Sequence, residues 1–272
     1  MAPAKKTVPL PAKLSTLVRL PQFFWFLGHF LSVFLFVLLQ VVSFFSRPWT
    51  IFLYRAVLGA ELVAYGIVVK QLGFFRRSAV KVQLLHDENV QYFVFAVVLA
   101  VASYKLGPWL KALYSYAIFS FFHVMAYCQS HLLEVMPIPI ATQAAWSDRI
   151  TYISANYNQQ ALYFAAMNEV FLLYDFLWAV PTLLFKIFRD PVYVVVQAAL
   201  MVAVAMFLKL RYVHSAHTKT ILAQLDARVS ALLSHPVVPP ALLQLYSVQF
   251  KGIVAAITDL LPTPVQLTKK TQ

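Results

Sequence analysis

The stretch from Gln22 to Ser46 is 25 residues long and contains no Asp, Glu, Lys or Arg. A helix of that length rises roughly 37 Å and spans the ~30 Å hydrocarbon core of a bilayer. Further apolar segments follow at 51–69, 90–104, 108–128, 158–188 and 192–208. Because backbone polar groups in lipid must be satisfied within the protein, such segments form helices. The sequence therefore predicts an all-α, polytopic membrane protein built from helical hairpins.

The composition agrees with this class. Hydrophobic residues make up 61% of the 272 residues and charged residues 12%, whereas soluble domains are nearer half apolar and a quarter charged. The formal net charge of +12 could indicate nucleic acid. In a chain this apolar, anionic lipid headgroups and the positive-inside bias explain it better, so we expect no nucleic-acid partner. The single cysteine, Cys128, excludes an internal disulfide.

The basic residues predict the topology. Four Lys or Arg lie in residues 1–21, a basic cytosolic arm, and seven against two acids lie in the tail, 209–272. Both ends are therefore expected in the cytosol, which requires an even number of crossings of the transmembrane helical domain, 22–208. Six crossings in three hairpins fit best. Four crossings, with 51–69 and one other segment at the interface, is the alternative, and the sequence does not decide between them.

The tail contains two predicted amphipathic helices that can lie in the headgroup plane. Their apolar stripes supply the predicted membrane contacts: Ile221, Leu225, Val229, Leu232, Tyr246, Phe250, Ile253 and Ile257. The predicted headgroup contacts are Lys209, Arg211, Lys219, Arg228 and Lys251. Alternatively, the two helices pack on each other or on the transmembrane bundle, and both interpretations stand.

Two acids in the fifth apolar segment need an explanation, because carboxylates inside a bilayer are expensive. Glu169 and Asp175 are six residues apart, about 120° around a helix, and therefore do not form a one-face pair. Asn168 and Asp175 do share a face. We expect the two acids to face protein and to pair with a group such as Arg55 or His123.

The polar run upstream of these acids predicts where their helix begins. Ser154 or Asn156 is a suitable N-cap, so the helix is expected to start at the membrane surface near Ser154. A structural or partner-binding role for the acids is favoured over transport, because no second acidic helix supplies a relay. The alternative function is a small transporter or channel regulator that uses Glu169, Asp175 and His123.

Sequence motifs for catalysis are missing. No G-x-S-x-G, Walker, G-x-G-x-x-G or H-E-x-x-H pattern occurs, so we expect neither an enzyme nor a cofactor. His214 and His217 are spaced for one helical face and could bind a metal. Without a cysteine or a nearby acid, a wet juxtamembrane helix is the better interpretation, and no metal site is predicted.

Four stretches resemble the transmembrane protein 33 family: "LHDENVQYFVF", "YSYAIFSFFHVMAY", "ISANYNQQALYFAAMNEVFLL" and "FLKLRYVHSAHTKTILAQL". The most specific elements are Ser154, Ala155 and Asn156, and the run Asn168–Phe171, which contains Glu169. The resemblance implies a non-enzymatic protein of the endoplasmic reticulum and nuclear envelope. It also implies curved membranes, nuclear pore complex assembly or distribution, reticulon-type membrane-shaping partners, membrane-binding C-terminal helices, and an importin-type partner on the basic tail.

Overall fold

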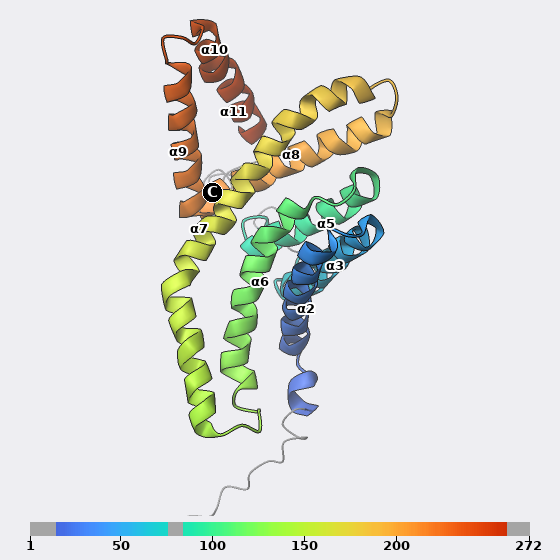
Figure 1. Ribbon diagram of the computed structural model, residues 1–272, viewed down its shortest axis with the longest axis vertical. Coiled ribbons are helices and arrows are strands. Elements are labelled where there is room, and N and C mark those ends of the chain that lie inside the picture. Colours follow the sequence, from blue (N-terminus) through green and yellow to red (C-terminus); the bar gives the residue numbers. More distant parts are fainter. Residues whose placement is uncertain (1–14, 76–83, 260–272) are drawn as a thin grey trace, which may run out of the picture.

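The computed structural model describes residues 15–75 and 84–259, the side chains at 177–178 and 257–259 excepted. These residues form helices joined by turns, which confirms the predicted all-α membrane fold (Figure 1). In chain order the elements are α2 (Pro21–Val42), α3 (Arg47–Gln71), α5 (Glu88–Leu106), η1 (Leu110–Leu113), α6 (Tyr114–Tyr127), η2 (Cys128–Leu132), α7 (Ile140–Lys186), α8 (Pro191–His214), α9 (Ala216–Leu233), α10 (Pro240–Gln244), η3 (Leu245–Phe250) and α11 (Lys251–Asp259).

Local chemistry explains where the helices begin. Prolines stand in the first turn of α2, α3 and α8, where the missing amide hydrogen is not needed. Asp87 caps α5 by accepting a hydrogen bond from the Asn89 amide at 2.8 Å. Asp190 caps α8 by accepting one from the Tyr193 amide at 3.1 Å. Each Asp thus satisfies one of the amide groups that a helix start leaves free.

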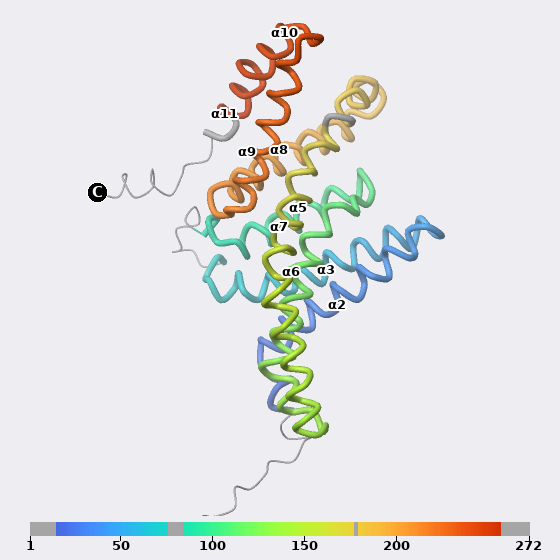
Figure 2. The backbone as a smooth tube through the Cα atoms, turned by 60° about the vertical axis from the view of Figure 1, so that its left-hand side comes forward, coloured from blue at the N-terminus to red at the C-terminus, as the bar shows by residue number. Residues whose placement is uncertain are grey.

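The bundle consists of three antiparallel hairpins. Helix α2 pairs with α3, α5 turns into η1 and α6, and the second half of α7 pairs with α8. The turns at 43–46, 107–109 and 187–190 gather at one end of the bundle, on the right in Figures 1 and 2. Gly107 makes its turn possible because its φ of 87° lies in the left-handed region that other residues avoid.

Five helices of the described part are long and apolar enough to cross a membrane: α2, α3, α5, α7 and α8. Helix α6 alone has 14 residues, which is too short for a crossing. It is continuous with η1 before it and with the π-helical turn η2 after it, so the helical stretch runs from Leu110 to Leu132. This stretch packs beside α2 and α7.

Helix α7 corrects the expected helix start near Ser154. It begins at Ile140, directly after Pro139, and its 47 residues correspond to about 70 Å. The prolines of "MPIPI" supply the break, and Ile150 packs with Met125 and Leu133 in a small second core. The first half of α7 therefore already has an apolar face to bury. Its lower half lies beside α6 and its upper half beside α8 (Figure 1).

The boundary of the tail also shifts. The expected boundary at 208/209 lies inside α8, which continues to His214. The break is Ser215, whose backbone is extended (φ −102°, ψ 118°) and whose hydroxyl accepts a hydrogen bond from the Thr218 amide at 3.2 Å. From this residue α9 turns away from α8, and α10 to α11 fold back beside α9 (Figures 1 and 2).

A glycine sets the close approach of α2 and α3. A Cβ at Gly28 would lie 2.9 Å from both the Ala60 carbonyl oxygen and the Ala64 Cβ. Small residues at such crossings allow helix backbones to approach in membranes, where packing rather than hydrophobicity holds helices together. In contrast, a Cβ at Gly59, on the outer side of α3, would meet nothing within 4 Å.

We predict that Gly28→Val destabilises the bundle by about 1–3 kcal/mol, because the branched side chain forces the two helices apart. Gly59→Ala is the matched control, and it should be neutral or stabilising by up to about 1 kcal/mol from helix propensity. Thermal unfolding of the purified protein in detergent measures both. Equal stability of the two variants would show that α2 and α3 do not meet at Gly28.

Candidate functional site: buried polar centres and an exposed tail

Glu169 is the centre of a buried polar cluster that joins three helices. The side chain lies on α7 and is 1% exposed. The Tyr92 hydroxyl, from α5, donates to its Oε1 atom. Arg211, from α8, places Nε 3.4 Å from its Oε2 atom and donates from a terminal nitrogen to Glu88 Oε1 at 2.8 Å. The expectation that Glu169 faces protein is therefore confirmed, but its partners are neither Arg55 nor His123.

The ion pair makes the buried charges tolerable. Arg211 is 5% exposed, and its guanidinium carbon also lies 5.3 Å from the Tyr92 ring centroid, within the range of a cation–π contact. A buried charge that loses its partner destabilises a protein by about 3–5 kcal/mol. Glu169 and Arg211 therefore hold α7 against α8, and Tyr92 and Glu88 connect both to α5.

The position of Arg211 corrects its predicted role as a headgroup contact. Because α8 extends to His214, Arg211 lies inside that helix and not in the tail. It shares the buried face of Val204, Phe207 and Leu208, at spacings of seven, four and three residues. The same spacing can be read in the sequence, but a helix end expected at 208 leaves Arg211 outside the helix.

A second buried centre lies between α2, α3 and α6. Glu61 is fully buried and accepts hydrogen bonds from the hydroxyls of Ser32 and Ser120 on its Oε1 atom, the latter at 2.7 Å. His29 Nδ1 lies 2.7 Å from Ser120 Oγ and 3.5 Å from Glu61 Oε2. Among the described residues, Glu61 Oε2 and His29 Nε2 have no hydrogen-bond partner. The 3.5 Å contact is thus electrostatic without being a hydrogen bond.

Tyr65 lies between the two centres. Its ring contacts His29 edge-on at 5.5 Å and stacks on Tyr92 at 5.7 Å. His123 belongs to the Glu61 side, with its ring centroid 4.7 Å from that of His29. Helix α3 therefore contributes a second buried acid, Glu61, in addition to Glu169 on α7. Sequence alone showed Glu61 only as an interruption of an apolar segment.

Asp175 forms a third, partly exposed site at the turn after α5. Its two carboxylate oxygens accept hydrogen bonds from Trp109 Nε1 at 2.8 Å and from Lys111 Nζ at 2.6 Å. Asn168, on the same face of α7 as predicted, donates to the Lys111 carbonyl oxygen at 2.9 Å. Together they fasten η1 to α7. Arg55 is not involved, because it donates to Ser103 instead.

The remaining family-motif residues lie on the outer side of α7. Ser154 is half-buried, whereas Ala155 and Asn156 are exposed. The Asn156 side chain donates to the Tyr152 carbonyl oxygen one turn earlier, at 2.7 Å. These residues are therefore inside a helix and do not cap one, and their side chains are available to a partner.

The tail packs on itself and on the transmembrane bundle, which is one of the two arrangements that the sequence left open. Helix α9 packs against α7 through Ile221, which is 6% exposed and belongs to the main core, so the prediction that Ile221 contacts membrane is wrong. His217 Nε2 lies 3.3 Å from Gln159 Oε1 at the same contact. Ile221 is buried because Thr218 and Ile221, three residues apart, share one face of the first turns of α9, where the helix is still beside the bundle.

A polar clasp closes the tail into a hairpin. Asp226 on α9 accepts a hydrogen bond from the Tyr246 hydroxyl at 2.8 Å and pairs with Lys251 Nζ at 2.7 Å. The hydrogen bond from Lys251, followed by that from Tyr246, lowers the pKa of Asp226 from its ordinary value. Partial burial, followed by the same bond to Asp226, raises the pKa of Tyr246 to about 12. The clasp is therefore intact at neutral pH.

Four of the eight predicted membrane contacts are exposed on this hairpin. Leu232 is 71% exposed and Ile253 59%, while Val229 and Tyr246 are half-buried. The other exposed apolar side chains are Leu225, Val237, Leu242, Leu245, Val248, Phe250 and Val254. The side chain of Ile257 lies outside the described part.

The predicted basic contacts differ in their exposure and in their partners. Lys219 and Arg228 are exposed, Lys209 is half-buried, and Lys251 is held by Asp226. His214 Nε2 lies 3.0 Å from His86 Nδ1 and does not face His217. Within 15–75 and 84–259, no group of three or more His, Cys, Asp or Glu side chains is placed to hold a metal ion.

Comparison with known proteins gives consistent matches over most of the chain. A family model described as Transmembrane protein 33/Nucleoporin POM33 matches residues 12–259. "Pore and endoplasmic reticulum protein of 33 kDa" of Saccharomyces cerevisiae is 31% identical over 85% of this chain and 88% of that protein. "Nucleoporin POM33" of Chaetomium thermophilum is 29% identical over 90% and 88%. "Tetra-spanning protein 1" of Schizosaccharomyces pombe is 28% identical over 89% and 86%. No solved structure matches the chain.

We predict that Glu169 and Arg211 are strongly coupled. Glu169→Leu and Arg211→Leu should each destabilise the protein by about 3–5 kcal/mol, because each leaves one buried charge unpaired. The double variant should lose much less than the sum. Glu169→Gln, which keeps the hydrogen-bonding shape, should be milder than Glu169→Leu.

The measurement is a double-mutant cycle on thermal or denaturant unfolding in detergent. Glu88→Gln is the control, since its side chain is 55% exposed and screened, and it should change stability by less than about 1 kcal/mol. Additive losses for the Glu169 and Arg211 variants would mean that the two side chains are not paired in the folded protein.

Proposed function

The chain belongs to the Transmembrane protein 33/Nucleoporin POM33 family, and from this premise we propose that it shapes or stabilises curved membrane at the endoplasmic reticulum and the nuclear pore. The printed names of two relatives support the location, because one refers to the pore and the endoplasmic reticulum and the other to a nucleoporin. The proposed activity is non-enzymatic and supports the assembly or distribution of nuclear pore complexes.

The observation that carries this proposal is the exposed apolar surface of the α9–α11 hairpin. Leu232, Val248 and Ile253 are each more than half exposed, on short helices that also carry exposed Lys219 and Arg228. Apolar side chains that enter the acyl boundary supply free energy of about 25 cal/mol per Å² buried. Basic side chains add about 1 kcal/mol each near an anionic surface. Such helices insert best where curvature opens the headgroup layer.

The hairpin architecture supports the same activity. We propose six crossings in three hairpins, with both chain ends and the tail in the cytosol. The turns at 43–46, 107–109 and 187–190 are short, so little protein mass lies on their side of the membrane. Most polar mass then lies in the cytosolic leaflet, as in a wedge. The name of the Schizosaccharomyces pombe relative says that that protein spans four times, and a four-crossing arrangement is the competing topology.

The partners follow from the exposed surfaces and the family. We propose that reticulon-type membrane-shaping proteins and nuclear pore components bind the membrane hairpins, and that an importin-type receptor reads the basic tail. Asn156, exposed on the outer side of α7, offers a polar contact for such a partner, and the exposed Ala155 lies next to it. Because Arg211 is buried, the exposed Lys219 and Arg228 are the proposed receptor contacts in the described part of the tail.

A second candidate function is favoured by one observation. Glu61 and His29 are buried ionisable groups that each keep one atom without a hydrogen-bond partner in the described residues, as a proton-carrying site would. Transport or channel regulation would then use Glu61, His29 and His123 together with Glu169, because Asp175 lies in a separate site. Proton flux into vesicles that disappears in Glu61→Gln, with folding intact, would establish this function in place of membrane shaping.

We predict that the tail of the full-length protein enters curved, anionic bilayers. In a Cys128→Ser background, an environment-sensitive dye at Ile253→Cys should shift to the blue in small phosphatidylserine-containing vesicles relative to large neutral ones. Aspartate at Leu232, Val248 and Phe250 should abolish the shift and also reduce the tubulation of large vesicles seen by electron microscopy. Raised salt should weaken the shift only in part, because it screens charge and not apolar burial.

Gln249→Asp is the control, since it adds a negative charge at an exposed polar position of η3 without removing an apolar side chain. It should leave both the shift and the tubulation within about twofold of the parent protein. A dye signal that is the same in all vesicles would mean that the tail does not enter the bilayer, and the membrane-shaping proposal would lose its main support.

A further inference from the structure

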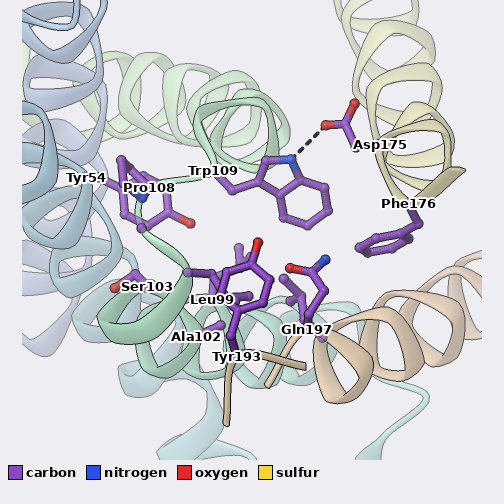
Figure 3. Close-up of a pocket in the computed structure, with 13 residues that line it drawn as sticks. Tyr54, Leu99, Ala102, Ser103, Pro108, Trp109, Asp175, Phe176, Tyr193 and Gln197 are labelled. Carbon is purple, nitrogen blue, oxygen red and sulfur yellow. Dashed lines mark hydrogen bonds between the residues drawn. The ribbon is translucent and has the colours of Figure 1, made fainter. Parts of the chain in front are cut away.

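A cavity of about 150 Å³ lies where the turn after α5 meets α7 and the start of α8. Figure 3 shows its wall of aromatic rings: Trp109 from the turn, Phe176 from α7, Tyr193 from α8 and Tyr54 from α3. The volume is well below the roughly 300–1,000 Å³ of pockets for drug-sized molecules, so the cavity suits a small group and not an acyl chain.

The arrangement of the rings is that of a cation-binding cage. Trp109 and Phe176 are inclined to each other by 49° with their centroids 5.5 Å apart, and Tyr54 is fully buried behind them. Aromatic faces attract cations, and quaternary ammonium groups are recognised by such rings. Tyr193 already carries an ammonium group, because Lys186 Nζ lies 3.4 Å from its ring centroid.

The polar atoms of the cavity favour a cation without N–H groups. The Asp175 carboxylate lines the cavity, but both of its oxygens already accept hydrogen bonds, from Trp109 and Lys111. Asp175 therefore offers no free acceptor, and its charge is shared with the Lys111 ammonium group. Gln197 is 9% exposed, and in the described part of the chain its amide makes no hydrogen bond; Figure 3 shows the amide directed into the cavity. The amide is therefore available to a group that enters the cavity.

The surrounding lysines give the depth of the cavity in the membrane. Lys105 pairs with Asp190 at 2.9 Å, Lys111 is 59% exposed, and Lys186 ends α7. Ammonium groups cannot rest in hydrocarbon, so this end of the bundle lies at the headgroup layer. Trp and Tyr are also enriched at that level. The cavity is therefore beside lipid headgroups, with cationic groups around its rim.

We propose that this cavity binds the choline headgroup of phosphatidylcholine. The trimethylammonium group occupies the cage of Trp109, Phe176, Tyr193 and Tyr54, near the charge of Asp175, and the Gln197 carbonyl oxygen faces its methyl groups. The lipid phosphate then lies at the rim, where Lys111 is exposed. This site is independent of the tail and of its membrane-shaping role. A bound lipid would fill the space between α3, α5, α7, α8 and the turn.

The test uses the full-length protein in dodecyl maltoside, a detergent without choline. Dihexanoyl phosphatidylcholine is titrated below its micellar concentration, and saturation transfer to the trimethylammonium protons is measured by NMR. We expect saturable transfer, with little competition from the phosphatidylglycerol or phosphatidylethanolamine of the same chain length. Phosphocholine and choline chloride are run in parallel. If both bind more weakly than the lipid, the ligand of the site is the lipid. If they bind equally well, the ligand is a free choline compound with the same ammonium chemistry.

Variants at Tyr193 identify the cavity. Tyr193→Leu should raise the Kd by about fivefold or more, because it removes a ring face. Tyr193→Phe keeps the ring and should bind within about twofold. Tyr212→Leu, on the same helix but far from the cavity, is the control, and unfolding temperatures verify that all variants fold. Unchanged binding in Tyr193→Leu, or equal binding of all three phospholipids, would overturn the proposal.

Discussion

The placement of charge inside a hydrocarbon layer is the constraint on which this structure depends. A carboxylate or guanidinium in the bilayer must be paired within the protein or reach an interface. Glu169 and Arg211 solve this by pairing with each other across α7 and α8, and Tyr92 and Glu88 bring α5 into the same cluster. Glu61 solves it with two serine hydroxyls and a histidine. Since lipid offers no hydrophobic drive for helix association, these contacts and the close packing at Gly28 determine which helices meet.

The same constraint explains the ends of the bundle. Lys105, Lys111 and Asp190 are not buried; they are paired at the helix ends, where the three short turns gather. Lys105 joins the end of α5 to the start of α8, and Lys111 joins η1 to Asp175 on α7. Charges at the turns therefore tie the hairpins to one another, while charges inside the helices hold the middle of the bundle. The chain leaves this system at Ser215, and the tail beyond it has apolar side chains with nothing in the described structure to cover them.

Much of this could be predicted from the sequence, because hydropathy and periodicity are local signals. The helices, the turn at Gly107, the burial of Glu169 and the shared face of Asn168 and Asp175 all follow from spacing. Partners could not be predicted, since Glu169 and Arg211 are 42 residues apart and only packing brings them together.

The ends of the helices could not be predicted from the sequence either. Placing the end of α8 at 208 instead of His214 turned a buried Arg211 into a surface residue. Placing the start of α7 near Ser154 leaves out about four turns of the helix, because "MPIPI" and a polar run look like a loop.

We propose that charges within the helices are sealed inside protein, whereas charges at the turns reach water on one side of the membrane. Single-cysteine labelling in sealed vesicles, in the Cys128→Ser background, tests this most directly. Cysteine at Arg189, in the α7–α8 turn, should react only with reagent on the lumenal side, and cysteine at Ser234, in the tail, only on the cytosolic side. Cysteine at Ala165 or Ser120, both beside the buried carboxylates, should react from neither side until the protein is denatured. Labelling of 189 and 234 from the same side, or ready labelling of 165 and 120 in the folded protein, would contradict the account.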